Sequence, residues 1–172
     1  MIINTKHIFI GILLFLLALV TIISLPWLLM FGLSIIEPSP PVPEIIYGEF
    51  PFRLEYSIDG EIFVVEDVVI CEYAGVKWNE GKGKYRVWKK RLKRYGEENL
   101  LIVEDGKQKI FCNVGSAEYY MGDQQYQPET SLVPTVYPSI GGEFHTQQEI
   151  MDKYKIKLIK WEFSPPIENK FE

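Results

Sequence analysis

The sequence predicts a mainly β (α+β) protein with an N-terminal transmembrane helix, a Pro-rich stalk and a small antiparallel β-sandwich or barrel-like domain carrying one or two short helices. Residues 8–25 form an apolar run without a charged side chain, and prolines crowd residues 38–43. Beyond them, short segments alternate between apolar and polar residues and meet at Asp-Gly turns, as antiparallel hairpins do. The predicted parts are a cytoplasmic N-terminus and anchor (1–36), a linker (37–46) and an extracytoplasmic β domain (47–172).

The apolar run "IFIGILLFLLALVTIISL" is the expected membrane anchor. Its length matches the ~20 residues that carry a helix across ~30 Å of hydrocarbon. Pro26 and Trp27, which follow it, are typical of the membrane interface. A cleaved signal peptide is the alternative, with Lys6 before the run and small residues at 32–34. The run is longer than the ~7–15 apolar residues of a signal peptide, which favours an uncleaved anchor.

Flanking charge predicts the orientation of the anchor. Lys6 and the amino terminus precede the run, whereas Glu37, Glu44 and Glu49 follow it before the first basic residue, Arg53. Since positive charge is retained in the cytoplasm, we expect a single-pass protein of the cell membrane with its C-terminal domain outside. Its first partner is then the lipid bilayer.

Two hairpins are expected in the domain. Residues 50–59 alternate strictly between apolar and polar side chains, so they predict a strand with one buried face, and Pro51 suggests an edge position or a strand start. Asp59-Gly60 predicts a type I′ turn into a strand over 61–73. This strand is apolar on both faces, which favours a central position with a bulge at Glu66-Asp67. A second hairpin turns at 105–106.

The remaining elements are short. Ser116 is expected to cap one helical turn that stops at Gly122. Thr146 and Glu149 form a capping box, which predicts a helix to about residue 155. Residues 159–163 then alternate as a last strand, which the prolines at 165–166 end.

The basic stretch "GKGKYRVWKKRLKRYG" (81–96) fits two structures. Aromatic and leucine residues spaced three and four apart would line one side of an amphipathic helix. The stretch is short for a helix that lacks tertiary support, and it lies between an apolar strand and a hairpin. A strand is therefore favoured over 84–95.

Two roles are open for this stretch. It is either a lysine-rich edge strand that resists aggregation or an anion-binding patch for lipid headgroups or acidic envelope polymers. The patch would comprise Lys84, Arg86, Lys89, Lys90, Arg91, Lys93 and Arg94. Nucleic acid is excluded as a partner because the chain carries a net charge of −5 and no recognition motif accompanies the cations.

The irregular segment 115–144 is a second candidate site, because long loops in compact domains are usually functional or disordered. Its aromatic side chains either form a recognition surface or pack within the loop itself. The residues concerned are Tyr119, Tyr120, Met121, Tyr126 and Tyr137.

No catalytic constellation is evident. Cys71 and Cys112 lie in apolar runs, where buried and inert thiols are favoured over a disulfide. His145 is the single histidine of the predicted domain, and no metal-ligand spacing or phosphate-binding loop is present. We therefore expect no metal, no cofactor and no catalytic residue.

Three segments, "YGEFPFRLEYSIDGE", "EYYMGD" and "IKWEFSPPI", together resemble a group of bacterial membrane-anchored extracytoplasmic proteins of unknown function. The resemblance implies the same architecture and transfers no activity and no site residue. The expected function is a binding or accessory module that contacts an envelope component or a membrane protein. The alternatives are a structural subunit of a membrane complex and, least favoured, an extracytoplasmic enzyme.

Overall fold

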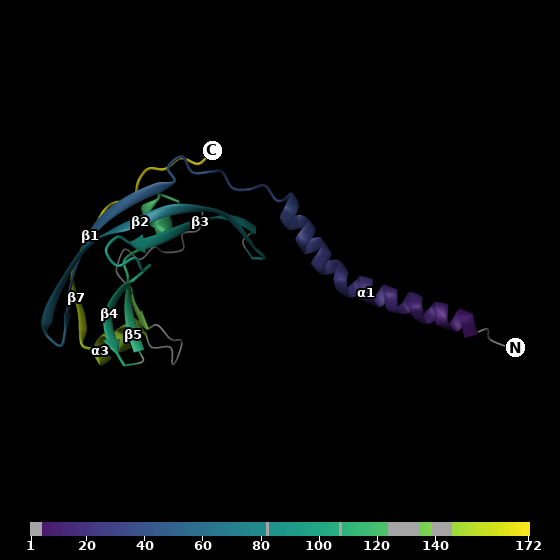
Figure 1. Cartoon of the computed structure of the whole chain (residues 1–172), viewed down its shortest axis with the longest axis horizontal. Helices are drawn as coiled ribbons and strands as arrows, with labels where there is room; N and C mark the ends of the chain where they lie inside the picture. Colours follow the sequence, from purple (N-terminus) through teal and green to yellow (C-terminus); the bar gives the residue numbers. More distant parts are fainter. Residues whose placement is uncertain (1–4, 82, 107, 124–134, 139–145) are drawn as a thin grey trace. The chain divides into compact units, whose positions relative to one another are not determined.

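The structure is a computed structural model that describes residues 5–81, 83–106, 108–123, 135–138 and 146–172 (Figure 1). Contacts within the chain divide it into two units. One comprises Met1–Pro40 and Val76–Tyr85, and the other comprises Pro41–Gly75 and Arg86–Glu172. The segment Val76–Tyr85 therefore belongs to the first of these units, although it lies within the predicted β domain (47–172).

The first element is a long apolar helix, α1 (Thr5–Ile36). Within it, Phe9–Leu29 is long and apolar enough to cross a membrane, and no part of this stretch is buried against the protein. Pro26 lies inside the helix and does not end it. The predicted N-terminal apolar helix is confirmed.

A four-stranded antiparallel sheet forms the larger part of the β domain. Its strands are β1 (Tyr47–Ile58), β2 (Glu61–Asn79), β3 (Gly83–Leu92) and β7 (Ile156–Phe163), in the order β3-β2-β1-β7. The favoured strand over the basic stretch is confirmed for residues 83–92, and the central position of β2 is confirmed as well. Strand β2 extends six residues beyond the predicted end at 73.

Strand β1 follows the predicted alternation, with Phe50, Phe52, Leu54 and Tyr56 buried. The suggestion that Pro51 marks a sheet edge is wrong, because β1 lies between β2 and β7. The pairing of β1 with β7 begins only at Phe52, so the missing N–H of Pro51 costs no ladder bond on that side. The carbonyl of Pro51 instead accepts a hydrogen bond from the hydroxyl of Ser164 at 2.9 Å.

The first hairpin turns where predicted. Asp59 and Gly60 have φ angles of 51° and 88°, the positive values that a type I′ turn requires. The bulge expected at Glu66-Asp67 is absent from the β1–β2 pairing, whose register runs unbroken from Tyr47↔Glu72 to Ile58↔Glu61. A register shift occurs between β1 and β7, at Glu55/Tyr56.

A second, three-stranded sheet contains β4 (Leu100–Asp105), β5 (Gln108–Asn113) and β6 (Thr135–Pro138), in the order β4-β5-β6. Both pairings are antiparallel, and Asp105 faces Gln108 across the predicted second turn. The described part of the domain is mainly β and antiparallel, as the sequence predicts, and its strands form two sheets.

Two short helices complete the described structure. Helix α2 (Ala117–Tyr120) is capped by the hydroxyl of Ser116, which accepts a hydrogen bond from the N–H of Tyr119. Helix α3 (Gln147–Lys153) carries the predicted capping box, with Thr146 and Glu149 satisfying each other's backbone N–H groups. Both helices begin where their caps predict.

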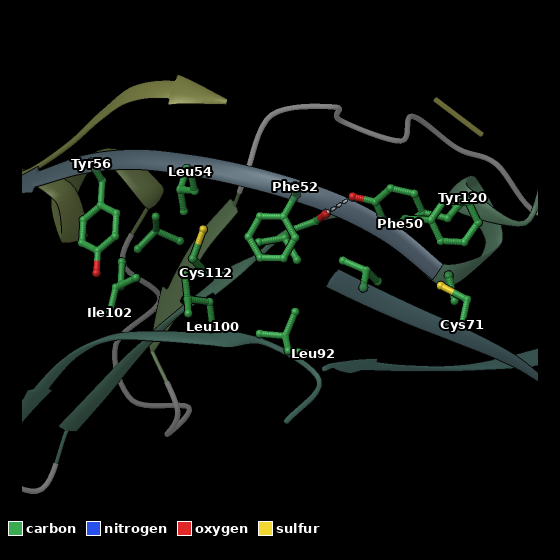
Figure 2. Close-up of a cluster of buried hydrophobic side chains, with 14 of the residues drawn as sticks. Phe50, Phe52, Leu54, Tyr56, Cys71, Leu92, Leu100, Ile102, Cys112 and Tyr120 are labelled. Atoms are coloured by element: carbon green, nitrogen blue, oxygen red, sulfur yellow. Dashed lines mark hydrogen bonds between the residues drawn. The ribbon is translucent and has the colours of Figure 1, made fainter. Parts of the chain in front are cut away.

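One hydrophobic core is shared by the two sheets (Figure 2). The inner face of β1 contacts side chains of β3, β4 and β5, among them Leu92, Leu100 and Cys112. Cys71 and Cys112 are free and buried, and Figure 2 shows the two thiols well apart. The expectation of two buried thiols is confirmed.

Residues 41–46 are hydrogen-bonded to the C-terminal tail. The backbones of Val42 and Glu172 bond each other at 2.9 and 3.2 Å, and the N–H of Glu44 donates to Lys170. The amide of Asn169 bonds both backbone groups of Ile45. The second half of the predicted linker is thus ordered against the β domain.

Candidate binding groove on the large sheet

A groove of about 950 Å³ lies on the large sheet, lined by residues 51–53 of β1, 66–68 of β2, 93–94 after β3 and 162–165 at the end of β7. Three consecutive cross-strand rows build it. Glu66, Arg53 and Glu162 form the first row, and Asp67, Phe52 and Phe163 form the second. Val68 faces Pro51 in the third. Since these rows lie on paired strands, the lining is held by the sheet ladder rather than by a loop.

Apolar groups form part of the lining. Val68 and Phe163 are half-buried, and Pro51 and Pro165 are exposed. The ring of Phe163 stacks on Trp161 at a centroid separation of 5.5 Å, which fixes its orientation. The groove therefore offers apolar surface that the fold itself leaves partly uncovered.

Arg53 is held by carboxylates on three sides. Its guanidinium lies 2.5 Å from Glu55, 3.1 Å from Glu66 and 3.4 Å from Glu162, measured between nitrogen and oxygen. Hydrogen bonds from Lys160 and Arg53 lower the pKa of Glu162. Glu162 therefore stays ionised, and this end of the groove presents fixed acidic oxygens around one engaged cation.

The opposite end is basic. Lys93 bonds Glu49 at 2.7 Å, and that hydrogen bond lowers the pKa of the Glu49 carboxyl. Asp67 accepts the backbone N–H of Arg94 at 3.0 and 3.2 Å, which positions the residue. Among the described residues, the guanidinium of Arg94 makes no hydrogen bond or ion pair. Arg94 is thus a cation in the groove that is available to a ligand.

A second hollow of about 550 Å³ adjoins the groove and shares Pro165 with it. It is lined by residues 165–169 together with Tyr119 and Gly122. The ring of Tyr119 contacts that of Phe163 edge-on, with 6.3 Å between the ring centroids. Phe163 lines the groove and Tyr119 lines the second hollow. Tyr119 thereby belongs to the same surface as the groove.

The basic residues predicted as an anion-binding patch are divided by β3. Arg86 and Lys90 face the domain interior beside the buried Trp88 and Leu92, whereas Lys89, Arg91 and Lys93 face outward. Arg91 lies 3.4 Å from Glu72, and Lys84 belongs to the unit of α1. Of the predicted set, Lys93 and Arg94 line the groove.

Arg86 is buried at 7% exposure and forms a bidentate pair with Asp123, both bonds being 2.7 Å. The indole N–H of Trp88 donates to the same carboxylate at 2.9 Å. The guanidinium also donates to the carbonyl of Pro41 and lies 4.2 Å above the ring of Phe171. Arg86 therefore joins four separate segments of the chain.

Lys90 has a comparable internal role without a carboxylate. Its ammonium donates to Asn113 and to the carbonyl of Gly115, both at 2.7 Å, and to Asn99 at 3.3 Å. Loss of hydration on burial lowers its pKa. The amine ties the turn after β3 to the end of β5.

The residues proposed for a recognition loop are mostly packed. Tyr120 and Met121 are fully buried, and the hydroxyl of Tyr120 donates to Val114 at 2.6 Å. Tyr137 lies on β6, where its ring contacts Phe111. Tyr126 lies outside the described residues. Tyr119 is the one described member that lines a hollow.

Neither a metal-ligand cluster nor a reactive thiol is found among the described residues. No group of three or more His, Cys, Asp or Glu side chains there could hold a metal ion. Burial raises the pKa of both thiols to about 12, so neither is a nucleophile at neutral pH. His145 lies outside the described residues.

The sequence-based predictions did not include the groove. The available signal was the outer face of β2, where Ile62, Val64, Val68 and Ile70 make a strand face apolar although the sheet covers its core with the other face. The buried ion pair of Arg86 and Asp123 could not be predicted from a local sequence pattern, because the two residues lie 37 positions apart in the chain. No family model, curated protein or solved structure matches the chain.

Proposed function

We propose that this chain is a membrane-anchored binding module that holds an extended polypeptide segment of another membrane protein in the groove on its large sheet. In this proposal α1 is an uncleaved single span with a cytoplasmic N-terminus. The two sheets form a small extracytoplasmic sandwich, and the prolines around residue 40 serve as a short spacer. The groove is the observation that carries the proposal.

The lining chemistry favours a polypeptide over an anionic polymer. Arg53, Lys93 and Arg94 are matched there by Glu66, Asp67 and Glu162, so the groove has no excess of positive charge. A polyanion gains affinity from a field of one sign, whereas a peptide backbone with mixed side chains gains it from apolar contact and paired charges. The uncommitted Arg94 suits a carboxylate of the partner.

Photo-crosslinking in intact cells tests the binding role. A photoreactive residue replacing Val68 in the full chain should capture a membrane protein, because its side chain lies in the groove. The matched control is Val64, which is exposed on the same strand but does not line the groove. Arg94→Glu should reduce capture at residue 68. Equal capture from both positions, or capture of polysaccharide alone, would contradict the proposal.

Topology is tested separately. Asp105→Cys places a thiol on an exposed turn, whereas the natural cysteines are buried and inert. A membrane-impermeant maleimide should label this variant in intact cells. Labelling that appears only after permeabilisation would reverse the proposed orientation, and release of the chain from membranes by alkaline washing would refute the anchor.

A further inference from the structure

We propose that the hairpin arm, residues 76–85 at the joined ends of β2 and β3, lies in the lipid headgroup layer and binds anionic phospholipid. The inference rests on the proposed membrane anchor and adds a second point of attachment to it. The hairpin arm is a surface separate from the groove, because all residues that line the groove lie in the other unit of the chain.

The end of α1 indicates the depth in the membrane at which the hairpin arm lies. The 21 residues Phe9–Leu29 are sufficient to cross the bilayer, since a helix of that length spans about 32 Å. The helix continues to Ile36, which adds roughly 10 Å and reaches the headgroup layer. Glu37 is the first charged residue after Lys6. Residue 37 therefore marks the level at which the chain meets water.

The hairpin arm is bonded to that residue. The backbone N–H of Lys84 donates to the carboxylate of Glu37 at 3.1 Å, and the ammonium of Lys84 donates to the Glu37 carbonyl at 2.6 Å. Gly83 has a φ of +70° and lies so close to the Glu37 carboxylate that a Cβ there would displace this carboxylate. Two groups of Lys84 on β3 thus bond the hairpin arm to the residue at which α1 ends.

The composition of the hairpin arm suits that depth. It holds three lysines and one glutamate, a formal charge of +2 on a chain whose net charge is −5. Lys77 and Val76 are exposed, and Trp78 and Tyr85 are half-buried. Tryptophan, tyrosine and lysine are the side chains that favour the membrane interface, and each nearby cation gains about 1 kcal/mol at an anionic surface. The turns of the other two hairpins carry Asp59 and Asp105 instead.

Spin labels on the full-length chain in phosphatidylcholine–phosphatidylglycerol vesicles test the inference. One label on Asn79→Cys reports the tip of the hairpin arm, and one on Asp105→Cys reports the turn between β4 and β5 as the matched control. A third on Ile22→Cys reports insertion of α1. A nickel-chelating lipid supplies a relaxation agent confined to the membrane surface.

The label at residue 79 should relax several-fold faster than that at residue 105, and it should be shielded from a water-soluble nickel complex. Exchanging phosphatidylglycerol for phosphatidylcholine, or introducing Lys77→Glu, should weaken both effects, whereas Lys157→Glu on β7 should not. Equal relaxation of the labels at residues 79 and 105, while the label at residue 22 is reached by oxygen dissolved in the bilayer, would overturn the lipid-binding role of the hairpin arm. The membrane anchor would then still stand. Failure of residue 22 to enter the bilayer would overturn the anchor and the inference together.

Discussion

Arg86 shows how one buried cation can organise a small β domain. Its guanidinium bonds Asp123 twice, bonds the carbonyl of Pro41 and faces the ring of Phe171. Side-chain exposure is 6% for the arginine and 3% for the aspartate, so neither charge is solvated if the other is removed. The cost of losing one partner is therefore larger than the net stability of the pair.

Replacing Arg86 by Met should lower the free energy of unfolding by about 3–5 kcal/mol, because it leaves Asp123 buried without its cation. Urea unfolding of the full chain in mild detergent, followed by tryptophan emission, measures the change. The control is Arg91→Gln, which removes an exposed pair with Glu72 and should cost at most about 1 kcal/mol. Similar losses from both variants would contradict the organising role of Arg86.

The buried thiols make the domain sensitive to alkali. Burial raises the pKa of Cys71 and of Cys112 from the ordinary 9.0 to about 12. Their stabilising contribution is fully present below pH 9.0 and is lost as the pH rises to about 12, since only the unfolded thiols ionise in that interval. The lowered pKa of Lys90 acts in the opposite direction as its amine loses the proton.

The free energy of unfolding should therefore fall above pH 9 by about 1.4 kcal/mol per pH unit for each thiol. Cys71→Ala/Cys112→Ala will be less stable at pH 7, because it leaves cavities in the core. Its stability should nevertheless decline less steeply than that of the natural chain between pH 9 and 11. Parallel pH profiles would show that the thiols do not titrate differently in the two states.

At the scale of elements, β3 decides what the basic stretch becomes. A strand directs successive side chains to opposite faces, so Arg86 and Lys90 turn inward while Lys89 and Arg91 turn outward. The sequence favoured a strand over residues 84–95, although the same residues could line one side of a helix. It also left open whether the cations protect a sheet edge or bind anions. Pairing with β2 settles the conformation, and the fate of each cation depends on partners far away in the sequence.

The turn after α2 depends on a glycine for two reasons. Gly122 has a φ of +65°, and a Cβ there would collide with the carbonyl of Ile167. That contact lies beside the backbone hydrogen bond from Ile167 to Tyr120, which measures 3.0 Å. The conformation and the close approach therefore both require glycine.

Gly122→Ala should destabilise the full chain by clearly more than the roughly 1–2 kcal/mol of left-handed backbone strain alone. Gly96→Ala supplies the matched control, since Gly96 has a φ of +74° with open space around it. Thermal unfolding of both variants measures the difference. Equal losses would show that the tail moves away from residue 122 without cost.

At the scale of the whole molecule, the C-terminal tail secures the entry into the β domain. Asn169 bonds the N–H of Ile45 at 3.0 Å, the carbonyl of Ile45 at 2.9 Å and the carbonyl of Met121 at 3.2 Å. One side chain thus connects residues 41–46, the end of α2 and the tail.

Asn169→Ala should loosen residues 41–46 and cost about 2–3 kcal/mol, from three hydrogen bonds of about 1 kcal/mol each. Limited proteolysis with mass spectrometry should show faster cleavage between residues 41 and 47. Glu168→Ala changes the exposed neighbour and should leave the cleavage rate unchanged. Unchanged cleavage in Asn169→Ala would mean that the β-bridge between Pro43 and Phe171 holds the segment alone.

The sequence by itself determined the local elements of this protein. The uncharged run of α1, the alternation of β1, the Asp59-Gly60 turn and the Thr146 capping box are each encoded within a few residues, so short-range physics sufficed to predict them. Only the tertiary structure decided which strands are neighbours, why Pro51 is tolerated in a central strand, which cations are buried, and where the groove lies. Those outcomes depend on residues distant in the chain, such as Arg53 with Glu162 and Arg86 with Asp123, whose pairing leaves no periodic or local signal.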